Sequence, residues 1–328
     1  MSSIEHGPRP VEIIDTTLRE GLQSPIWDDV GRFYPSDANK LDIGCALMKY
    51  GIRYIETFAP NVGEDEERGL VILDHGARRM YVDLTGNPVY LLAHVRCHPR
   101  DVEEAIKAGA NGLNFYIGTS GESQQFSHGK RLDEIINIAS PLIEDVRRSH
   151  PDLLLRFSGE DAFRTPISDL FTVYDSVAES VDRLGTPDTV GTATPVKVAE
   201  RVHALKEKYP NVPLEGHFHN DRGLSMINSM VAIQAGIQFI QSTILGIGER
   251  SGITSTTGLL FNLYLENPDA LAGYDLSSSY ALNVLLSQIL GIQVPTTEPV
   301  SLTNRTHSAG VHAAAVLKGS SAYEAHPL

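Results

Sequence analysis

The sequence is poor in cysteine and has no long apolar runs. Cys45 and Cys97 are the only two cysteines, too few for a disulfide framework, which favours a reducing compartment. No apolar run approaches the roughly 20 residues that a membrane-spanning helix needs. The first ten residues, MSSIEHGPRP, lack the apolar core of a secretory signal. We therefore expect a soluble, cytoplasmic protein without a membrane partner.

Positive charge is also scarce. The chain has 27 Lys and Arg against 41 Asp and Glu, a formal net charge of −14. Because contacts with phosphates need clustered cations, nucleic acid is a poor candidate partner. Hydrophobic residues make up 41% and charged residues 21%, which is typical of a globular protein and too apolar for disorder. A length of 328 residues fits either two domains or one α/β barrel of about 250 residues with an appendage.

Short apolar runs alternate with amphipathic stretches along most of the chain. Asp37–Tyr50 carries apolar residues at helical spacing, and Pro195–Lys208 begins with a proline, which suits a first helical turn. Eight strand–helix pairs predict an α/β fold with a parallel sheet, and eight is the number that closes into a (β/α)8 TIM barrel. A doubly wound open sheet would need a glycine-rich turn after its first strand, and Asp15–Gln23 is not one. The strands are expected at Val11–Leu18, Tyr54–Ala59, Val89–Val95, Gly112–Ile117, Leu153–Ser158, Val181–Thr186, Leu214–His219 and Phe239–Leu245.

The alternation stops after about Leu265. We expect a catalytic barrel over residues 1–270 and a short C-terminal helical arm over residues 271–328. The arm contains an apolar helical stretch, Ala281–Leu290, and a second stretch, Thr306–Leu317, that includes His307 and His312. It is too short to be a second domain.

Polar and charged side chains gather where the expected strands end. Catalytic groups of a TIM barrel sit at the C-terminal ends of the strands and in the loops that follow. Charges that are even partly buried cost free energy unless they are paired or bound to a ligand. So many at one rim predict a site for a charged ligand. The residues are Asp15, Arg19, Glu20, Gln23, His94, Arg96, His98, Arg156, Ser158, Glu160, Asp161, Asp188, Thr189, His217, His219, Asn220, Asp221, Glu249 and Arg250.

The most specific of these signals is His217-Phe218-His219. Alternate residues of a strand point to the same face, so both imidazoles are expected to face the same mouth of the barrel. Two histidines and one carboxylate commonly hold a divalent metal ion with open positions for substrate. Glu20, just past the first strand, is the best third ligand. Zn, Mn and Mg all fit such a set, and a pair of hydrogen-bonded histidines without a metal is the alternative.

Five long motifs resemble those of the DRE-TIM metallolyase family, and they occur in the order that the family has. The resemblance extends from Val11 to Glu324. Within the family, HVRCH (His94–His98) and the tail HSAGVHAAAVLKGSSAYE (His307–Glu324) are most similar to homocitrate synthases. The five motifs are DTTLREGLQSP (Asp15–Pro25), RFSGEDAFR (Arg156–Arg164), DTVGTATP (Asp188–Pro195), EGHFHNDRGL (Glu215–Leu224) and GIGERSGIT (Gly246–Thr254).

The resemblance implies a metal site and a charged group beside it. Glu20, His217 and His219 match the metal ligands of the family. Arg19 matches the arginine beside the carbonyl oxygen of a 2-oxo acid, where a guanidinium stabilises the alkoxide that forms when the carbonyl is attacked.

The resemblance also implies where the acid substrate binds. Thr189 matches the residue that binds its C1 carboxylate. His98, Arg156 and Ser158 match positions that hold the distal carboxylate of 2-oxoglutarate, and arginine suits this role because it binds carboxylates bidentately. Two alternatives remain open: Arg156 as a structural ion pair, for instance with Asp161, and His98 as a helix N-terminal residue.

The base of the reaction is implied to come from two parts of the chain. Glu160 and His312 match a pair that takes a proton from the methyl group of acetyl-CoA, and Tyr323 matches a catalytic tyrosine nearby. The arm would thus contribute active-site residues. Related synthases are dimers in which tail residues reach the partner's active site, so we expect a homodimer.

The implied activity is a metal-dependent Claisen condensation of acetyl-CoA with a 2-oxo dicarboxylic acid, an acyltransferase reaction of class EC 2.3.3. The first candidate is 2-oxoglutarate, giving homocitrate and CoA. The alternatives within this class are oxaloacetate, phosphonopyruvate or another 2-oxo acid. A lyase of hydroxyacyl-CoA is less favoured, because Leu245–Thr254 lacks the reactive cysteine of that group. A non-catalytic barrel and a non-haem Fe(II) oxygenase, which shares the metal-ligand logic, are the remaining hypotheses.

The sequence departs from the family in four places. Ile253 replaces an asparagine that ligates the metal in isopropylmalate synthases, and Leu22 replaces an acidic residue common in homocitrate synthases. The loop Ser24–Ser36 is longer than usual, and we expect it, with Trp27, to shape the pocket for the 2-oxo acid. The chain stops soon after Tyr323, from which we expect no C-terminal regulatory domain.

Overall fold

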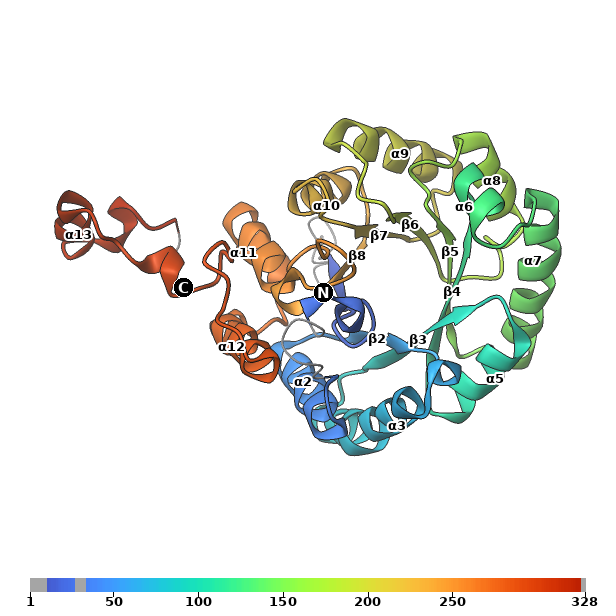
Figure 1. Ribbon diagram of the computed structural model, residues 1–328, viewed down its shortest axis with the longest axis horizontal. Coiled ribbons are helices and arrows are strands. Elements are labelled where there is room, and N and C mark those ends of the chain that lie inside the picture. The colour runs from blue at the N-terminus through green and yellow to red at the C-terminus, as the bar shows by residue number, and fades with distance from the viewer. Residues whose placement is uncertain (1–10, 27–33, 326–328) are drawn as a thin grey trace, which may run out of the picture.

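The computed structural model describes residues 11–26 and 34–325. Eight strands follow one another in order around a ring, and β8 pairs with β1 to close it (Figure 1). All neighbouring pairs are parallel, which confirms the predicted (β/α)8 TIM barrel. The strands are β1 (Glu12–Asp15), β2 (Tyr54–Phe58), β3 (Tyr90–Arg96), β4 (Gly112–Gly118), β5 (Leu154–Glu160), β6 (Arg183–Asp188), β7 (Leu214–Phe218) and β8 (Phe239–Ser242).

Helices surround the barrel, as Figure 1 shows. The prediction of a helix over Asp37–Tyr50 is confirmed to the residue, because Ser36 caps its first turn and Gly51 ends it. Among the described residues, no helix combines the length and the apolar character needed to cross a membrane. The helices are α2 (Asp37–Tyr50), α3 (Glu64–Leu73), α4 (Arg79–Thr85), α5 (Pro99–Lys107), α6 (Gly121–Phe126), α7 (Leu132–Ser149), α8 (Ile167–Asp175), α9 (Pro195–Lys208), α10 (Ser225–Gln234), α11 (Thr256–Glu266), α12 (Ser279–Leu290) and α13 (Gly310–Val316).

Some strands end earlier than their apolar pattern predicts. β1 ends at Asp15, because the carbonyl of Thr16 accepts hydrogen bonds from the N–H groups of Arg19 and Gly21 and turns the chain. β8 ends before Leu245, which adopts a left-handed φ of 60°. In both cases the residues beyond the strand form the loop at the rim of the barrel, where TIM-barrel active sites lie.

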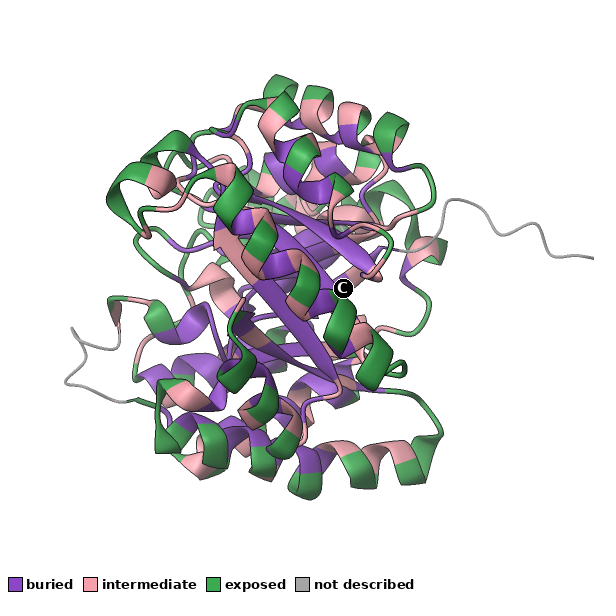
Figure 2. Ribbon diagram, turned by 90° about the vertical axis from the view of Figure 1, so that its right-hand side faces the viewer, coloured by how far each residue is buried: buried purple, intermediate pink, exposed green. Residues whose placement is uncertain are grey.

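The apolar core lies between the strands and the helices. Figure 2 shows buried strands at the centre and helices whose outer faces are exposed. This is the burial expected of amphipathic helices packed on a parallel sheet. Fully buried members from both layers include Ile43 of α2, Leu91 of β3, Ile143 of α7 and Leu184 of β6.

The inside of the barrel is polar. Gln241 of β8 and Asn114 of β4 both donate hydrogen bonds to Glu56 of β2. Neither β8 nor β4 is a neighbour of β2, so these bonds cross the interior of the barrel. Buried charges are costly unless they are paired and hydrogen-bonded. The residues that share this burial, each at most 3% exposed, are Glu56, Asn114, Arg156, Arg183, Glu215 and Gln241.

The C-terminal arm has two parts. Its first helix, α12, packs against α2 and α11. The segment after it is attached to the barrel by the buried Glu298, which accepts a hydrogen bond from Thr257 at 3.1 Å, and by Asn283, which donates to the carbonyl of Val300 at 3.0 Å. Beyond this attachment the chain runs away from the barrel to α13 (Figure 1).

We predict that a side chain at Gly51, where the end of α2 meets the start of the arm, destabilises the protein. Its φ is 102°, and an added Cβ would lie 2.1 Å from the carbonyl oxygen of Gly273. Gly51→Ala should therefore lower the free energy of unfolding by the left-handed backbone cost of about 1–2 kcal/mol, plus about 1–3 kcal/mol of overpacking. Urea denaturation followed by circular dichroism measures this change in the free energy of unfolding.

The matched control is Gly86→Ala at the end of α4. Gly86 has a φ of 70° and no atom within 4 Å of an added Cβ, so only the backbone cost applies. Equal destabilisation by the two substitutions would contradict the importance of the Gly273 contact.

Candidate active site

A cavity of about 570 Å³ opens at the C-terminal ends of the strands. Of the residues to which the family resemblance gives a role, all but His98, His312 and Tyr323 line it. Residues that the sequence argument did not single out also line it, chiefly Tyr116 and Gln241. The main lining residues are Arg19, Glu20, His94, Arg96, Tyr116, Arg156, Ser158, Glu160, Thr189, His217, His219, Gln241, Glu249 and Arg250.

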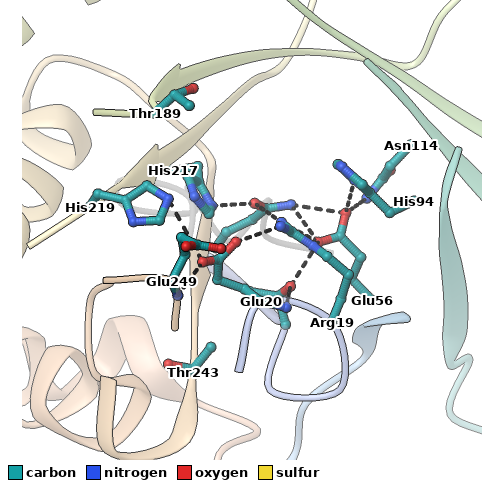
Figure 3. Close-up of polar contacts among 12 residues, drawn as sticks. Arg19, Glu20, Glu56, His94, Asn114, Thr189, His217, His219, Thr243 and Glu249 are labelled. Atoms are coloured by element: carbon teal, nitrogen blue, oxygen red, sulfur yellow. Dashed lines mark hydrogen bonds and ion pairs between the residues drawn. The ribbon is translucent and has the colours of Figure 1, made fainter. Parts of the chain in front are cut away.

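The structure brings Glu20, His217 and His219 together, as Figure 3 shows. One potential ligand atom from each lies within 4.8 Å of the others, and all three residues are buried. Glu20 Oε1 lies 3.8 Å from His219 Nε2 and accepts a hydrogen bond from the N–H of Glu249 at 2.9 Å. Glu20 follows β1, whereas His217 is on β7 and His219 directly follows it.

The electrostatics of this group suit a divalent cation. Burial lowers the pKa of His217 to about 3 and also lowers the pKa of His219, so both rings are neutral. Burial would raise the pKa of Glu20, but the charge of Arg19 and the hydrogen bond from the N–H of Glu249 lower that pKa to about 2. His219 Nδ1 is buried with no hydrogen-bond partner among the described residues. Two neutral imidazoles and an ionised carboxylate are the donor set that such an ion requires.

A carboxylate in the middle of β2, Glu56, organises the residues next to this donor set. It is fully buried. Burial would raise its pKa, but Arg19 and His94 outweigh it and hold that pKa well below the ordinary value. Its two oxygens contact Thr16 Oγ1 at 2.8 Å, Arg19 Nε at 3.0 Å, Asn114 Nδ2 at 2.5 Å, Gln241 Nε2 at 3.2 Å and His94 Nδ1 at 3.3 Å.

Sequence reasoning missed Glu56 because it considered only residues at strand ends. The available signal was an acidic residue inside the otherwise uncharged strand YIETF. A charge within a buried strand is costly without partners, so its presence already implied a set of donors inside the barrel.

Arg19 is held between two carboxylates. Its Nη1 donates to Glu20 Oε2 at 2.5 Å, and its Nε donates to Glu56 Oε2 at 3.0 Å. Its guanidinium therefore lies beside the donor set in a fixed orientation.

His94 and Arg156 lie two strands apart, at the same level of the barrel, with Asn114 between them. His94 on β3 is in register with Asn114 on β4, which is in register with Arg156 on β5. The ring of His94 stacks on Tyr116, with centroids 4.1 Å apart. Burial and the charge of Arg19 lower the pKa of His94 to about 4, despite the nearby Glu56. A neutral imidazole and a phenol therefore form this part of the cavity wall.

Arg156 forms a buried ion pair, but with Glu215 rather than with Asp161. Its Nε lies 2.8 Å from Glu215 Oε1, and its Nη2 contacts the same oxygen. Asp161 instead pairs with Arg164. Arg156 still lines the cavity, so the ion pair and a role in binding are compatible.

His98 lies outside the cavity lining. β3 ends at Arg96, and the side chain of His98, 61% exposed, caps α5 by accepting a hydrogen bond from the N–H of Arg100 at 3.2 Å. His98 is therefore positioned as a residue at the N-terminus of a helix, which is the alternative to a substrate-binding role. Of the two histidines in HVRCH, only His94 lines the cavity.

Three rim loops are joined by Arg250. Its guanidinium pairs with Asp221 at 2.7 Å and donates to the carbonyl of Thr189 at 2.7 Å. Thr189 Oγ1 in turn accepts a hydrogen bond from the N–H of Asp161 at 2.9 Å. Arg250 has a left-handed φ of 55°, a strained backbone of the kind found at functional sites. These contacts set the position of Thr189 at the edge of the cavity.

Glu160 ends β5 at the same rim. Burial, together with the charge of Asp161, raises the pKa of its carboxyl group above the ordinary value. A carboxylate with a raised pKa is a stronger base than an exposed one, which suits a role in proton transfer.

The model of one family, described as HMGL-like, matches residues 10–286. The chain belongs to the HMGL-like family. This confirms the family predicted from the five motifs, since the match covers the whole barrel and the first two thirds of α12.

Curated relatives of the chain include homocitrate synthases. The mitochondrial enzyme of Saccharomyces cerevisiae is 33% identical over 98% of this chain and 72% of its own length. The homocitrate synthase of Pyrococcus abyssi is 32% identical over 96% of this chain and 82% of its own length. Among solved structures, the HMG-CoA lyase of Bacillus subtilis superposes with a TM-score of 0.76 at 22% identity, over 90% of this chain and 99% of that one. At that identity the likeness supports the fold alone.

Two predicted catalytic residues of this HMGL-like chain lie on the arm. The rings of His312 and Tyr323 stack on each other with centroids 4.0 Å apart. Tyr323 is 48% exposed, and neither residue lines the cavity of its own barrel. Their roles therefore stay predictions.

The long loop after β1 lies largely outside the described residues, Trp27 included. Tyr34, at its end, donates a hydrogen bond to Glu66 and lies under the ammonium group of Lys40, 5.1 Å from the ring centre. Tyr34 is not among the residues that line the cavity. That this loop shapes the pocket stays a prediction. A variant with a shortened loop tests it, because its selectivity among 2-oxo acids should then change.

We predict that His217→Ala and His219→Ala each abolish stoichiometric metal binding. Each substitution removes one of only three protein ligands, and two ligands do not hold a divalent ion tightly. Elemental analysis of purified protein and calorimetric titration of the metal-free protein with Zn²⁺ or Mn²⁺ measure this. His203→Ala, on the exposed face of α9, is the control and should bind normally. A double His217 and His219 variant that keeps one ion per chain would contradict the assignment.

Proposed function

We propose that the protein is an acyltransferase that condenses acetyl-CoA with 2-oxoglutarate to give homocitrate and free CoA. The observation that carries this proposal is the position of Arg19 beside the Glu20, His217 and His219 donor set. Membership of the HMGL-like family and the homocitrate synthases among its relatives support the same reaction.

The donor set and Arg19 together suit attack on a ketone. A divalent ion held by Glu20, His217 and His219 would supply Lewis-acid polarisation of the ketone carbonyl. Arg19 stabilises the negative charge that develops on the carbonyl oxygen. Because Glu20 and Glu56 already hold its guanidinium in place, little reorganisation is needed during the reaction.

The carboxylates of the acceptor bind on either side of the reacting carbonyl. Thr189 binds the C1 carboxylate. The distal carboxylate binds His94, Arg156 and Ser158, so that His94 replaces His98 in the set predicted from the motifs. The negative charge of that carboxylate favours the protonated ring of His94, in which Nδ1–H keeps its contact with Glu56 and Nε2–H donates to the substrate. The lining of the cavity supports this choice. Arg156 uses Nε and Nη2 for Glu215, which leaves Nη1 for the substrate.

The proton of the acetyl methyl group goes to the pair of Glu160 and His312, with Tyr323 beside them. The resulting carbanion attacks the ketone, and hydrolysis of the thioester then releases CoA. Because the arm runs away from its own barrel (Figure 1), we propose that His312 and Tyr323 reach the cavity of a second copy in a homodimer. The arm from about residue 302 onward is then the part that completes the partner's site.

Other 2-oxo acids as the acceptor can be tested by comparing substrates. Oxaloacetate or phosphonopyruvate as acceptor would use the same donor set. The lyase alternative draws on the fold of the solved neighbours alone, and the loop Leu245–Thr254 has no cysteine. We also propose a cytosolic location, in line with the cytosolic isozyme among the relatives, although mitochondrial ones occur too.

We predict that CoA is released from acetyl-CoA when 2-oxoglutarate is added, with a higher kcat/KM than for oxaloacetate, phosphonopyruvate or other 2-oxo acids. A free-thiol assay measures the release, and mass spectrometry identifies homocitrate. Arg19→Gln should lower kcat about 100-fold or more, since it removes a donor to the developing alkoxide. An absence of CoA release with every acid in the panel would remove the synthase proposal.

We predict opposite outcomes for the two histidines of HVRCH. His94→Ala should raise the KM for the 2-oxo acid about tenfold or more, because a hydrogen bond to a charged group contributes about 1.5–3 kcal/mol. His98→Ala should leave that KM within about twofold and at most loosen the start of α5. Steady-state kinetics with varied 2-oxo acid separates them, and the reverse pattern would restore His98 to the binding site.

A further inference from the structure

Gln241 is a neutral side chain between the metal-donor set and Glu56. It lies on β8 and is 1% exposed. Its Oε1 lies 2.6 Å from His217 Nδ1, and its Nε2 lies 3.2 Å from each oxygen of Glu56. The amide of Gln241 therefore links the histidine on one side to the carboxylate on the other. Nothing in the motif argument or the family resemblance assigns it a role.

The chemistry of the neighbours determines which way the amide faces. Glu56 is an ionised carboxylate, so its oxygens only accept, as they do from the guanidinium of Arg19 and the amide nitrogen of Asn114. The NH2 group of Gln241 must then face Glu56. A flipped amide would set its oxygen against an anionic oxygen and its NH2 against His217.

This orientation decides where His217 carries its proton. With Oε1 of Gln241 facing the ring, the close contact at 2.6 Å is a hydrogen bond only if Nδ1 bears the hydrogen and donates it. A neutral imidazole has one N–H, so Nε2 is unprotonated and presents a lone pair.

We propose that Gln241 is a positioning residue that fixes the tautomer and ring orientation of His217, so that Nε2 is the atom offered to the divalent ion. This inference rests on the proposed metal site, and it does not depend on which 2-oxo acid is used. Partners of this kind commonly orient metal-binding histidines through their second ring nitrogen.

An amide suits this position because it accepts and donates at the same time. A carboxylate would accept from His217 but would place a second anion about 3.2 Å from Glu56, where like charges repel. A methionine would fill a similar volume without a strong acceptor. Arg19 Nη2 also lies 3.5 Å from Gln241 Oε1. Through Glu56, the same amide thus joins the orientation of His217 to that of Arg19.

The first test uses the unmodified protein without metal. Long-range ¹⁵N–¹H spectra of the histidine rings report which nitrogen carries the hydrogen, and His217→Gln assigns the signals. We expect His217 as the Nδ1–H tautomer with an unprotonated Nε2. An Nε2–H tautomer, or a rapid mixture of the two tautomers, would overturn the proposal. This test needs no substitution at Gln241.

The second test compares substitutions at Gln241 by calorimetric titration of the metal-free proteins with Zn²⁺ alone. Gln241→Met should weaken the affinity about 10–100-fold, the usual effect of losing such a partner, and should mix the tautomers of His217. Gln241→Glu keeps the acceptor and should keep the Nδ1–H tautomer. The exchanged pair Glu56→Gln with Gln241→Glu restores one donor and one acceptor and should also keep it.

The matched control is Asn114→Leu, which removes another donor to Glu56 without touching His217. It should leave the tautomer unchanged and the Zn²⁺ affinity within about twofold. Unchanged affinity and an unchanged ring spectrum in Gln241→Met would refute the positioning role, as would an equal effect of Asn114→Leu. If Gln241→Met does not fold, as circular dichroism would show, the tautomer in the unmodified protein decides alone. All these readouts are independent of CoA release, so they distinguish this inference from failure of the proposed reaction.

Discussion

The buried carboxylate of Glu56 is the interaction on which the inside of this barrel depends. A lone ionised carboxylate in a fully buried position would be strongly destabilising. Here five donors from other parts of the barrel converge on its two oxygens, and the result is a hydrogen-bonded network in place of an apolar core. The charge of Glu56 is thereby paired, and a buried network of this kind rigidifies the side chains that it joins.

The network orients both halves of the proposed chemistry. On one side Glu56 fixes Arg19, which faces Glu20. On the other side it fixes Gln241, which faces His217. The position of the cation that would stabilise an alkoxide and the position of a metal ligand thus depend on one carboxylate. This is how a rigid scaffold prepares charges before a substrate arrives.

The same arrangement bears on how an acidic protein would bind the anionic substrates proposed for it. The net charge is −14, yet arginines line the cavity, each held by an acidic residue: Arg19 by Glu56, Arg156 by Glu215 and Arg250 by Asp221. The acidic partners hold the guanidinium groups in fixed directions. Cations at fixed positions in the cavity are what an anionic substrate needs, whatever the net charge of the chain.

The sequence by itself determined the eight-stranded barrel, its family and the three residues of the donor set. Apolar periodicity is a local property, and the HxH spacing places two histidines on one face whatever the rest of the chain does. It could not reveal Glu56 or Gln241 as partners, because β2 and β8 lie far apart in the chain and meet only when the barrel closes. It also could not separate His94 from His98, since that choice depends on where β3 ends and α5 begins. The direction of the arm was decided by tertiary structure too, through the attachment of Glu298 to α11. The contacts of Glu56, Gln241 and Glu298 join segments that are far apart along the chain, so no local sequence pattern reveals them.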